Sequence, residues 1–199
     1  MINFKYKKEI EEYVFKEYVE KRKSSIVAKL IYDEIMNVPI NDNDESIKKL
    51  ISHVKNEWEN VATNFYNQME KFYDIKIFDP DLTCFLTRLD IFPYSYSNET
   101  KEKWFSAPLF GNPASRIGII MHELCHYFQP IELPRDIKEA MPVILNDHDK
   151  FQMYGIERGS DSEEEQRWRK IIWTIHQGGG NFTDLLKFIE SEKNKNNGA

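Results

Sequence analysis

The residues best suited to chemistry lie in "GIIMHELCHYFQP", residues 118–130. His122 and His126 are four residues apart, and Glu123 directly follows the first histidine. On an α-helix, side chains four apart lie within about 40° of each other, so both imidazoles can face one tetrahedral zinc ion. Glu123 lies about 100° from His122, where its carboxylate can reach a metal-activated water without being a ligand. This spacing predicts two metal ligands and one general base.

The helix that carries this motif is expected to be central in the fold. Its apolar residues surround most of its circumference: Ile117, Ile119, Ile120, Met121, Leu124 and Phe128. Two histidines and a glutamate in such a helix are costly unless a metal or hydrogen bonds satisfy them. The alternative is a pair of hydrogen-bonded core histidines without a metal. A Cys125 thiolate could also bind zinc, but a small buried side chain is the favoured interpretation of this cysteine.

The segment "IIMHELCHYF" resembles the zinc-binding helix of the zincin metallopeptidases, and strand-like segments precede it as in that superfamily. The resemblance covers about residues 75–150 and does not extend to the N-terminal helices. It implies a zincin-like fold, a zinc cofactor and a peptide or protein substrate. It also implies that the strand just upstream, "KWFSAPLF" at 103–110, forms the sheet edge along which an extended peptide lies.

The choice of third ligand separates the branches of this superfamily. The metzincin branch needs glycine and histidine where this chain has Gln129 and Glu132, so that branch is excluded. A deformylase-like site needs a cysteine in a glycine-bearing loop, whereas Cys84 lies in strand-like "LTCFLT". The gluzincin branch takes a glutamate from a following helix. Glu139 matches, thirteen residues after His126 in "DIKEAMPVILN", a segment that also resembles small bacterial zincin-like proteins.

Other groups stay open as the third ligand, of which His148 is the strongest: Glu132, Asp136, Asp147, His148 and Glu157. A peptidase also needs a group that stabilises the oxyanion. The downstream candidates are His148, Tyr154, Arg167 and His176, and the sequence does not choose among them. His53, on an early amphipathic helix, is interpreted as a structural or surface residue.

Periodicity predicts the elements that position these residues. Helices are expected over Phe4 to about Met36, Ser46–Phe72 (capped by Asp44 or Ser46), Pro113–Phe128, 135–150 with a kink at Pro142, 161–176 and 181–192, before a frayed tail "KNKNNGA". Strands are expected at 75–78, 82–92 and 103–110. The predicted fold class is α+β: one mostly helical zincin-like domain, 1–199, with a small sheet against the motif helix. Its N-terminal helical part is about 1–73 and its metal-site part about 74–192.

Composition narrows the function classes. The net charge of −6 argues against nucleic-acid binding, because no basic surplus can neutralise phosphates. No apolar run approaches the ~18 residues of a membrane helix, which argues against a membrane protein. Two cysteines cannot form a disulfide framework, and the N-terminus has charges every few residues, so a cytoplasmic location is expected.

The motif predicts a zinc-dependent hydrolase, and the resemblance to zincins implies a gluzincin-type metallopeptidase in which Glu123 is the general base. In that mechanism Glu123 activates the water and then passes a proton to the leaving amine. The alternative is a zinc-binding regulatory or interaction protein whose site is structural or inactive. A third hypothesis is a helical scaffold that binds no metal.

Overall fold

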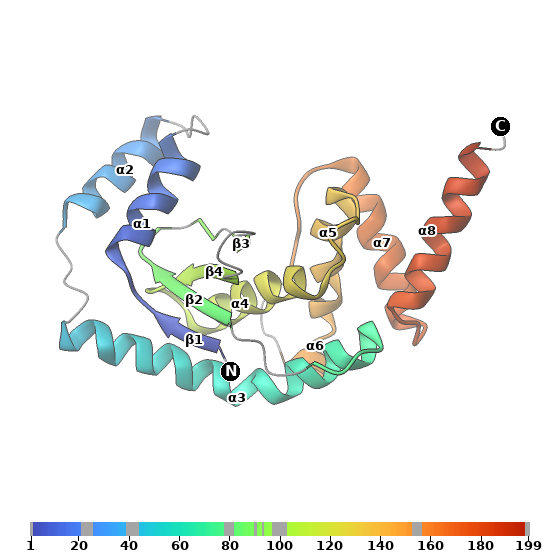
Figure 1. Ribbon diagram of the computed structural model, residues 1–199, viewed down its shortest axis with the longest axis horizontal. Helices are drawn as coiled ribbons and strands as arrows, with labels where there is room; N and C mark the ends of the chain where they lie inside the picture. Colours follow the sequence, from blue (N-terminus) through green and yellow to red (C-terminus); the bar gives the residue numbers. More distant parts are fainter. Residues whose placement is uncertain are drawn as a thin grey trace. The chain divides into compact units, whose positions relative to one another are not determined.

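In a computed structural model the chain is an α+β protein, in which helices predominate over one small sheet (Figure 1). The structure describes residues 2–20, 26–38, 44–77, 82–89, 91–92, 94–96, 103–152 and 157–197. The described strands are β1 (Ile2–Lys5), β2 (Leu82–Thr87), β3 (Tyr94–Tyr96) and β4 (Lys103–Pro108), in the spatial order β1-β2-β4-β3. The predicted fold class, α+β, is confirmed at this level.

The sheet is parallel except at one edge. β1 pairs in parallel with β2, and β2 pairs in parallel with β4, with Cys84 opposite Phe105. β3 pairs antiparallel with β4 and places Tyr94 opposite Phe105. Most side chains of β2 are buried, which is typical of a strand in the interior of a parallel sheet covered on both faces.

The helical elements follow the predicted periodicity over most of the chain. Their bounds are α1 (Lys8–Val14), a π-helical turn (Phe15–Glu20), α2 (Ile26–Asn37), α3 (Glu45–Tyr73), α4 (Pro113–Phe128), α5 (Arg135–Ala140), η2, a 3₁₀ helix (Met141–Asn146), α6 (His148–Phe151), α7 (Glu163–Gln177) and α8 (Phe182–Asn197). Asp44 caps α3, as predicted, by accepting a hydrogen bond from the Ser46 amide at 2.8 Å. The tail predicted to fray from Lys193 instead stays helical as far as Asn197.

The prediction of helix from Phe4 onward is wrong at the N-terminus. Ile2 and Phe4 are buried and alternate with exposed Asn3 and Lys5, so this segment has the period of a strand. It becomes β1 because pairing with β2 satisfies its backbone and buries its two apolar side chains. Four residues beside a strongly helical sequence are too short for this alternation to be recognised.

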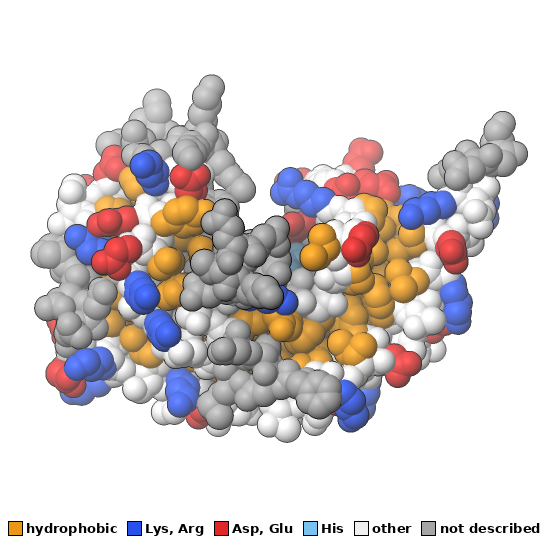
Figure 2. Space-filling view, in the orientation of Figure 1, with side chains coloured by type: hydrophobic (Ala, Val, Ile, Leu, Met, Phe, Trp, Pro, Cys, Tyr) orange, Lys and Arg blue, Asp and Glu red, His pale blue; other side chains and the backbone are white. Residues whose placement is uncertain are grey.

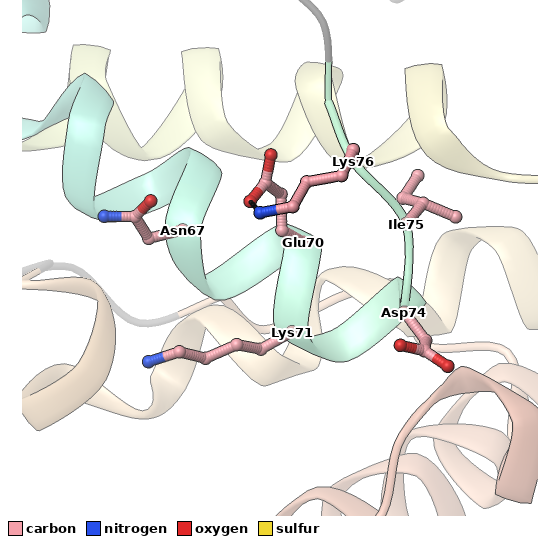
Figure 3. A pocket seen from close by; sticks show the side chains of 6 residues that line it. All are labelled: Asn67, Glu70, Lys71, Asp74, Ile75 and Lys76. Atoms are coloured by element: carbon pink, nitrogen blue, oxygen red, sulfur yellow. Dashed lines mark hydrogen bonds and ion pairs between the residues drawn. The ribbon is translucent and has the colours of Figure 1, made fainter.

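The strand predicted at 75–78 is also wrong within the described residues. Asp74 ends α3 with a φ of 52°, and Ile75, Lys76 and Ile77 adopt no regular structure. The Glu70 carboxylate accepts a hydrogen bond from the Ile77 amide at 2.9 Å, so a side chain takes the place of a neighbouring strand. Figure 3 shows Lys76 reaching back to the same carboxylate, 3.3 Å away, beside a shallow surface pocket. Phe78 lies outside the described residues.

The helix predicted over 135–150 changes type where Pro142 was expected to disturb it. It is α-helical over Arg135–Ala140 and becomes a 3₁₀ helix at Met141, one residue before the proline. Proline has no amide hydrogen to donate, and its ring crowds the preceding turn, so a regular α-helix does not continue. Glu139 therefore lies in the last turn of α5, directly before this change.

The chain forms two compact units, which we describe separately. The first consists of residues 1–60 and 79–123, and the second of residues 61–78 and 124–199. α3 and α4 each contribute residues to both. The first unit contains the sheet, whose core includes Leu82, Leu86, Phe105 and Leu109. The second contains α5, η2, α6, α7 and α8 (Figure 1), and its core includes Phe65, Met69, Ile137, Phe151 and Ile172.

A buried ion pair between Glu11 and Arg88 connects several segments of the first unit. Glu11 on α1 is fully buried, and Arg88 after β2 places Nη2 2.6 Å from its Oε2 atom. The same guanidinium donates to the carbonyls of Ile35 and Val38, each at 2.8 Å, at the end of α2. The Tyr6 hydroxyl donates to Glu11 at 2.9 Å. These contacts join the segments after β1 and β2 to both N-terminal helices.

The face of the molecule drawn in Figure 2 carries charged side chains of both signs. On the face drawn in Figure 2, acidic and basic side chains occur in small interspersed groups among hydrophobic ones. Among the residues that the structure describes, no helix has both the length and the apolar composition to cross a membrane.

Candidate metal centre

α4 fixes the direction of the two motif histidines. The Asn112 side chain caps its N-terminus by accepting a hydrogen bond from the Ala114 amide at 2.8 Å. Ile120, Met121 and Leu124 are fully buried, so one face of the helix is held in the core. His122 and His126 lie one turn apart on a face that is only partly buried. The helix thereby presents both imidazoles in the same direction.

α5 brings Glu139 to these histidines. One ligand atom from each of His122, His126 and Glu139 can be chosen so that all three lie within 4.8 Å of one another. Nε2 of His126 and Oε2 of Glu139 are 3.7 Å apart. Arg135, one turn earlier on α5, has its Nε atom 3.8 Å from the other Glu139 oxygen. We call these three residues the His122–His126–Glu139 cluster.

The donor set of the cluster fits a zinc ion. Zinc takes two imidazole nitrogens and a carboxylate oxygen at roughly 2.0–2.2 Å, which places neighbouring ligand atoms about 3.4 Å apart in a tetrahedron. The 3.7 Å between His126 and Glu139 is close to that spacing. All three ligand atoms lie within 4.8 Å of one another, so small side-chain adjustments would bring them to the tetrahedral spacing. Three protein ligands leave a fourth position for water or substrate.

Gln129 joins the two helices behind the cluster and was missed as a site residue. Its Oε1 atom lies 3.0 Å from Nδ1 of His126, and its Nε2 atom donates to the carbonyl of Lys138 at 2.9 Å. Lys138 directly precedes Glu139, so this buried amide connects one predicted ligand to the residue beside another. In the sequence, the only indication of this role is the side-chain amide three residues after His126, the second histidine of the motif.

Glu123, the predicted general base, is on the buried side of the same helix with 8% of its surface exposed. Burial raises the pKa of the Cys84 thiol in β2 well above its ordinary value, and the negative charge of Glu123 raises it further. Cys84 is therefore a neutral buried thiol, unlike a thiolate ligand. Cys125 is fully buried as well and is not part of the cluster, in agreement with its interpretation as a packing residue.

The other candidate third ligands do not join the cluster among the described residues. Asp147 Oδ2 instead lies 2.9 Å from both His176 Nε2 and Lys150 Nζ. Glu157 Oε1 lies 3.4 Å from Arg169. His148 is exposed at the start of α6 and lines a separate recess. Glu132 lies exposed in the turn between α4 and α5, and Asp136 is half-buried in the first turn of α5.

Of the four candidate oxyanion-stabilising groups, Arg167 and His176 have other partners, His148 lines a separate recess, and Tyr154 lies outside the described residues. Arg167 is paired on the surface with Glu164 at 3.1 Å and Glu192 at 2.7 Å. His176 is buried and bonded to Asp147. Tyr154 lies outside the described residues, so no group is assigned this role. His53, expected to be structural or on the surface, is exposed with Nε2 2.9 Å from Glu57.

The expectation that "KWFSAPLF" forms the edge of the sheet is wrong. β4 lies in the interior of the sheet, between β2 and β3. The edge on that side is β3, which runs antiparallel to β4 and pairs with it over Lys103–Phe105. A strand of three residues that directly follows Pro93 has too little sequence to show an alternating pattern.

No protein-family model, curated protein or solved structure matches this chain. The likeness to zincins therefore rests on the motif and on the segments around it. Membership of that superfamily stays a prediction, and so does the binding of zinc.

Proposed function

We propose that this chain is a zinc-dependent hydrolase that cleaves peptide bonds, with His122, His126 and Glu139 as ligands and Glu123 as the general base. The observation that carries the proposal is the approach of the three ligand groups to within 4.8 Å. Two of them come from one helix and the third from the next, as a gluzincin-type arrangement requires. A bound zinc ion would supply Lewis acidity, which polarises a carbonyl and activates water.

Glu123 would move the proton in this reaction. Its carboxylate accepts a proton from the attacking water and then delivers it to the nitrogen of the leaving amine. Glu123 is not one of the cluster's ligand residues, in keeping with the proposed division between ligands and general base.

The exposure of the cluster favours a catalytic site over a structural one. The Glu139 side chain is 38% exposed and that of His126 is 15% exposed, so a substrate carbonyl can approach from solvent. Structural zinc sites are closed by a fourth protein ligand. Neither Cys125 nor His148 joins the cluster as such a ligand.

Metal content tests the proposal directly. Wild-type protein, Glu139→Ala and His148→Ala are purified without chelator, and zinc per chain is measured by plasma mass spectrometry. We expect about one zinc per wild-type chain, loss in Glu139→Ala and retention in His148→Ala. A folded wild-type protein without metal would refute the proposal.

Cleavage of a mixture of unstructured peptides, with products identified by mass spectrometry, tests the hydrolase itself. Zinc held by four protein ligands, together with no cleavage, would support the alternative of a structural or inactive site in an interaction protein. The number of protein ligands can be read from X-ray absorption at the zinc edge.

A further inference from the structure

A second recess lies in the second unit, apart from the three ligand residues. It has a volume of about 510 Å³, which lies within the range of small-ligand sites. Val143 and Asn146 of η2 line one part of it, and Arg158, Lys170 and Trp173 line another. We call it the Val143–Trp173 pocket. All of its lining residues belong to one compact unit, so its shape does not depend on the other unit.

The base of the pocket is a hydrogen-bonded frame. The Asn146 side chain donates to the Glu157 carbonyl at 2.9 Å and accepts from the Glu157 amide at 2.7 Å. The Arg169 guanidinium donates to the same carbonyl and lies 3.4 Å from the Glu157 carboxylate and 4.0 Å from that of Glu165. Arg169 is thus neutralised by two carboxylates, and it serves to hold the frame rather than to attract a ligand.

The rim of the pocket carries the cations that remain available. Arg158 and Lys170 are exposed, and neither side chain has an ion-pair partner among the described residues. Arg167 and Lys187, by contrast, are paired with nearby carboxylates. Two unpaired cations beside the Trp173 ring and the Val143 side chain complement a ligand that has both a carboxylate and an apolar group.

The chain places this pocket close to Glu139. Val143 is four residues after Glu139 in the continuous helical segment Arg135–Asn146. Four residues rise about 6–8 Å along a helix axis, which is the length of roughly two residues of an extended peptide. A peptide bound at both places would have two or three residues between the cleaved bond and the side chain in the pocket.

We propose that the Val143–Trp173 pocket binds an acidic side chain of the peptide, with a neighbouring apolar side chain against Trp173. The proposal rests on the proposed function for the role of this peptide as substrate. The binding of an acidic peptide to the pocket is tested independently of the proposed function. The probes are acetyl-Gly-Phe-Glu-Gly-amide and its neutral twin, which has glutamine in place of glutamate. Their dissociation constants are measured by titration calorimetry with chelator present, so that no cleavage occurs.

The wild-type protein should bind the glutamate peptide about tenfold more tightly than the glutamine peptide, because hydrogen bonds to charged groups are the stronger ones. Lys170→Glu and Arg158→Glu should each abolish that preference. Lys193→Glu is the matched control, since it makes the same charge change at an exposed lysine of α8 away from the pocket. The control should keep the wild-type preference.

Equal binding of the two peptides by wild type, or no measurable binding, would overturn the proposal. The same holds if Lys170→Glu and Lys193→Glu behave alike, because net charge rather than the pocket would then set the preference. A preference that depends on Lys170 in a protein that binds no zinc would sustain the pocket and refute the hydrolase. A preference for cleaving peptide bonds near acidic side chains would connect the pocket with the proposed hydrolase activity.

Discussion

The Gln129 amide lies between Nδ1 of His126 and the carbonyl of Lys138, at 3.0 Å and 2.9 Å. A carbonyl can only accept, so the amide nitrogen must face Lys138 and the amide oxygen must face His126. Nδ1 of His126 therefore carries the hydrogen, and the lone pair is left on Nε2, the atom that faces Glu139 at 3.7 Å. Gln129 thus holds the tautomer that a metal ligand requires.

Gln129 is therefore expected to act as a positioning residue for metal binding. Gln129→Ala should weaken zinc binding by roughly 10–100-fold, as loss of a partner behind a histidine ligand usually does. Gln129→Glu should retain part of the affinity, because a carboxylate can still accept from Nδ1. Zinc dissociation constants measured by competition with a chromogenic chelator give the comparison.

Gln68→Ala is the control for Gln129→Ala. Gln68 is a partly buried glutamine on α3 that is bonded to Asn64 at 3.4 Å, and its loss should leave zinc affinity unchanged. Unchanged affinity in Gln129→Ala would mean that the amide only joins the two helices. A thermal unfolding midpoint for each variant separates that structural contribution from the effect on zinc.

Glu123→Gln should separate catalysis from metal binding. The amide keeps the size of the side chain but cannot accept a proton, so we expect peptide cleavage to fall by roughly 10²–10⁴-fold. Zinc content should remain at the wild-type level, because Glu123 is not among the ligand residues. The turnover rate of a cleaved peptide and zinc per chain are measured on the same preparation. Full activity would remove Glu123 from the proposed mechanism.

Sequence patterns predicted those parts of the fold that local periodicity controls. α3 and α4 begin and end within a residue of the predicted bounds, because each has an apolar face over at least four turns. β1 was missed because its strand character depends on pairing with β2, about eighty residues later. The Glu11–Arg88 pair spans 77 residues and has no local signal at all.

The residues of the candidate site also differ in whether local sequence patterns predict them. His122 and His126 are brought together by one helix, so their spacing alone predicted their approach. Glu139 was predicted through a family resemblance, and it reaches His126 because the turn after Pro130 folds α5 back. Gln129 acts through the backbone of Lys138, a contact between two elements that no residue pattern encodes.

Removing one partner of the buried Glu11–Arg88 pair should strongly destabilise the protein. Arg88→Met leaves the fully buried Glu11 carboxylate without its cation, and we expect a loss of about 3–5 kcal/mol in the free energy of unfolding. Adding Glu11→Leu should recover much of that loss, because the second change removes the stranded charge. Urea unfolding of the two single variants and the double variant closes the cycle.

Arg167→Met is the comparison for Arg88→Met. Arg167 also has carboxylate partners, but its side chain is 47% exposed, and an exposed pair contributes about 1 kcal/mol or less. If Arg88→Met and Arg167→Met lower the free energy of unfolding by the same small amount, the Glu11–Arg88 pair contributes little to the stability of the first unit.

His176 should make the second unit sensitive to mild acid. Its ring packs against those of Phe72, Phe151 and Trp173, with centroids 6.0–6.4 Å away, and Nε2 contacts Asp147. Burial and then the positive charge of Lys150 lower the pKa of His176 below its ordinary value of 6.5, against the opposing effect of Asp147. The unfolded chain therefore takes up the proton first. Stability from neutral His176 is complete above about pH 6.5 and is lost as the pH falls toward the lower folded pKa.

The variant that tests this pH dependence is His176→Gln, whose amide can still donate to Asp147 but does not titrate. The fall in thermal midpoint between about pH 7.5 and about pH 5.5 should be smaller in His176→Gln than in wild type. His53→Gln, at a histidine whose side chain is 64% exposed, should behave like wild type. Chelator is present throughout, because zinc release also depends on pH. Asp147 does not account for a change in this range, since hydrogen bonds from Lys150 and His176 outweigh its burial and hold its pKa below 3.8. An equal fall in all three proteins would exclude His176 as the group that responds to acid.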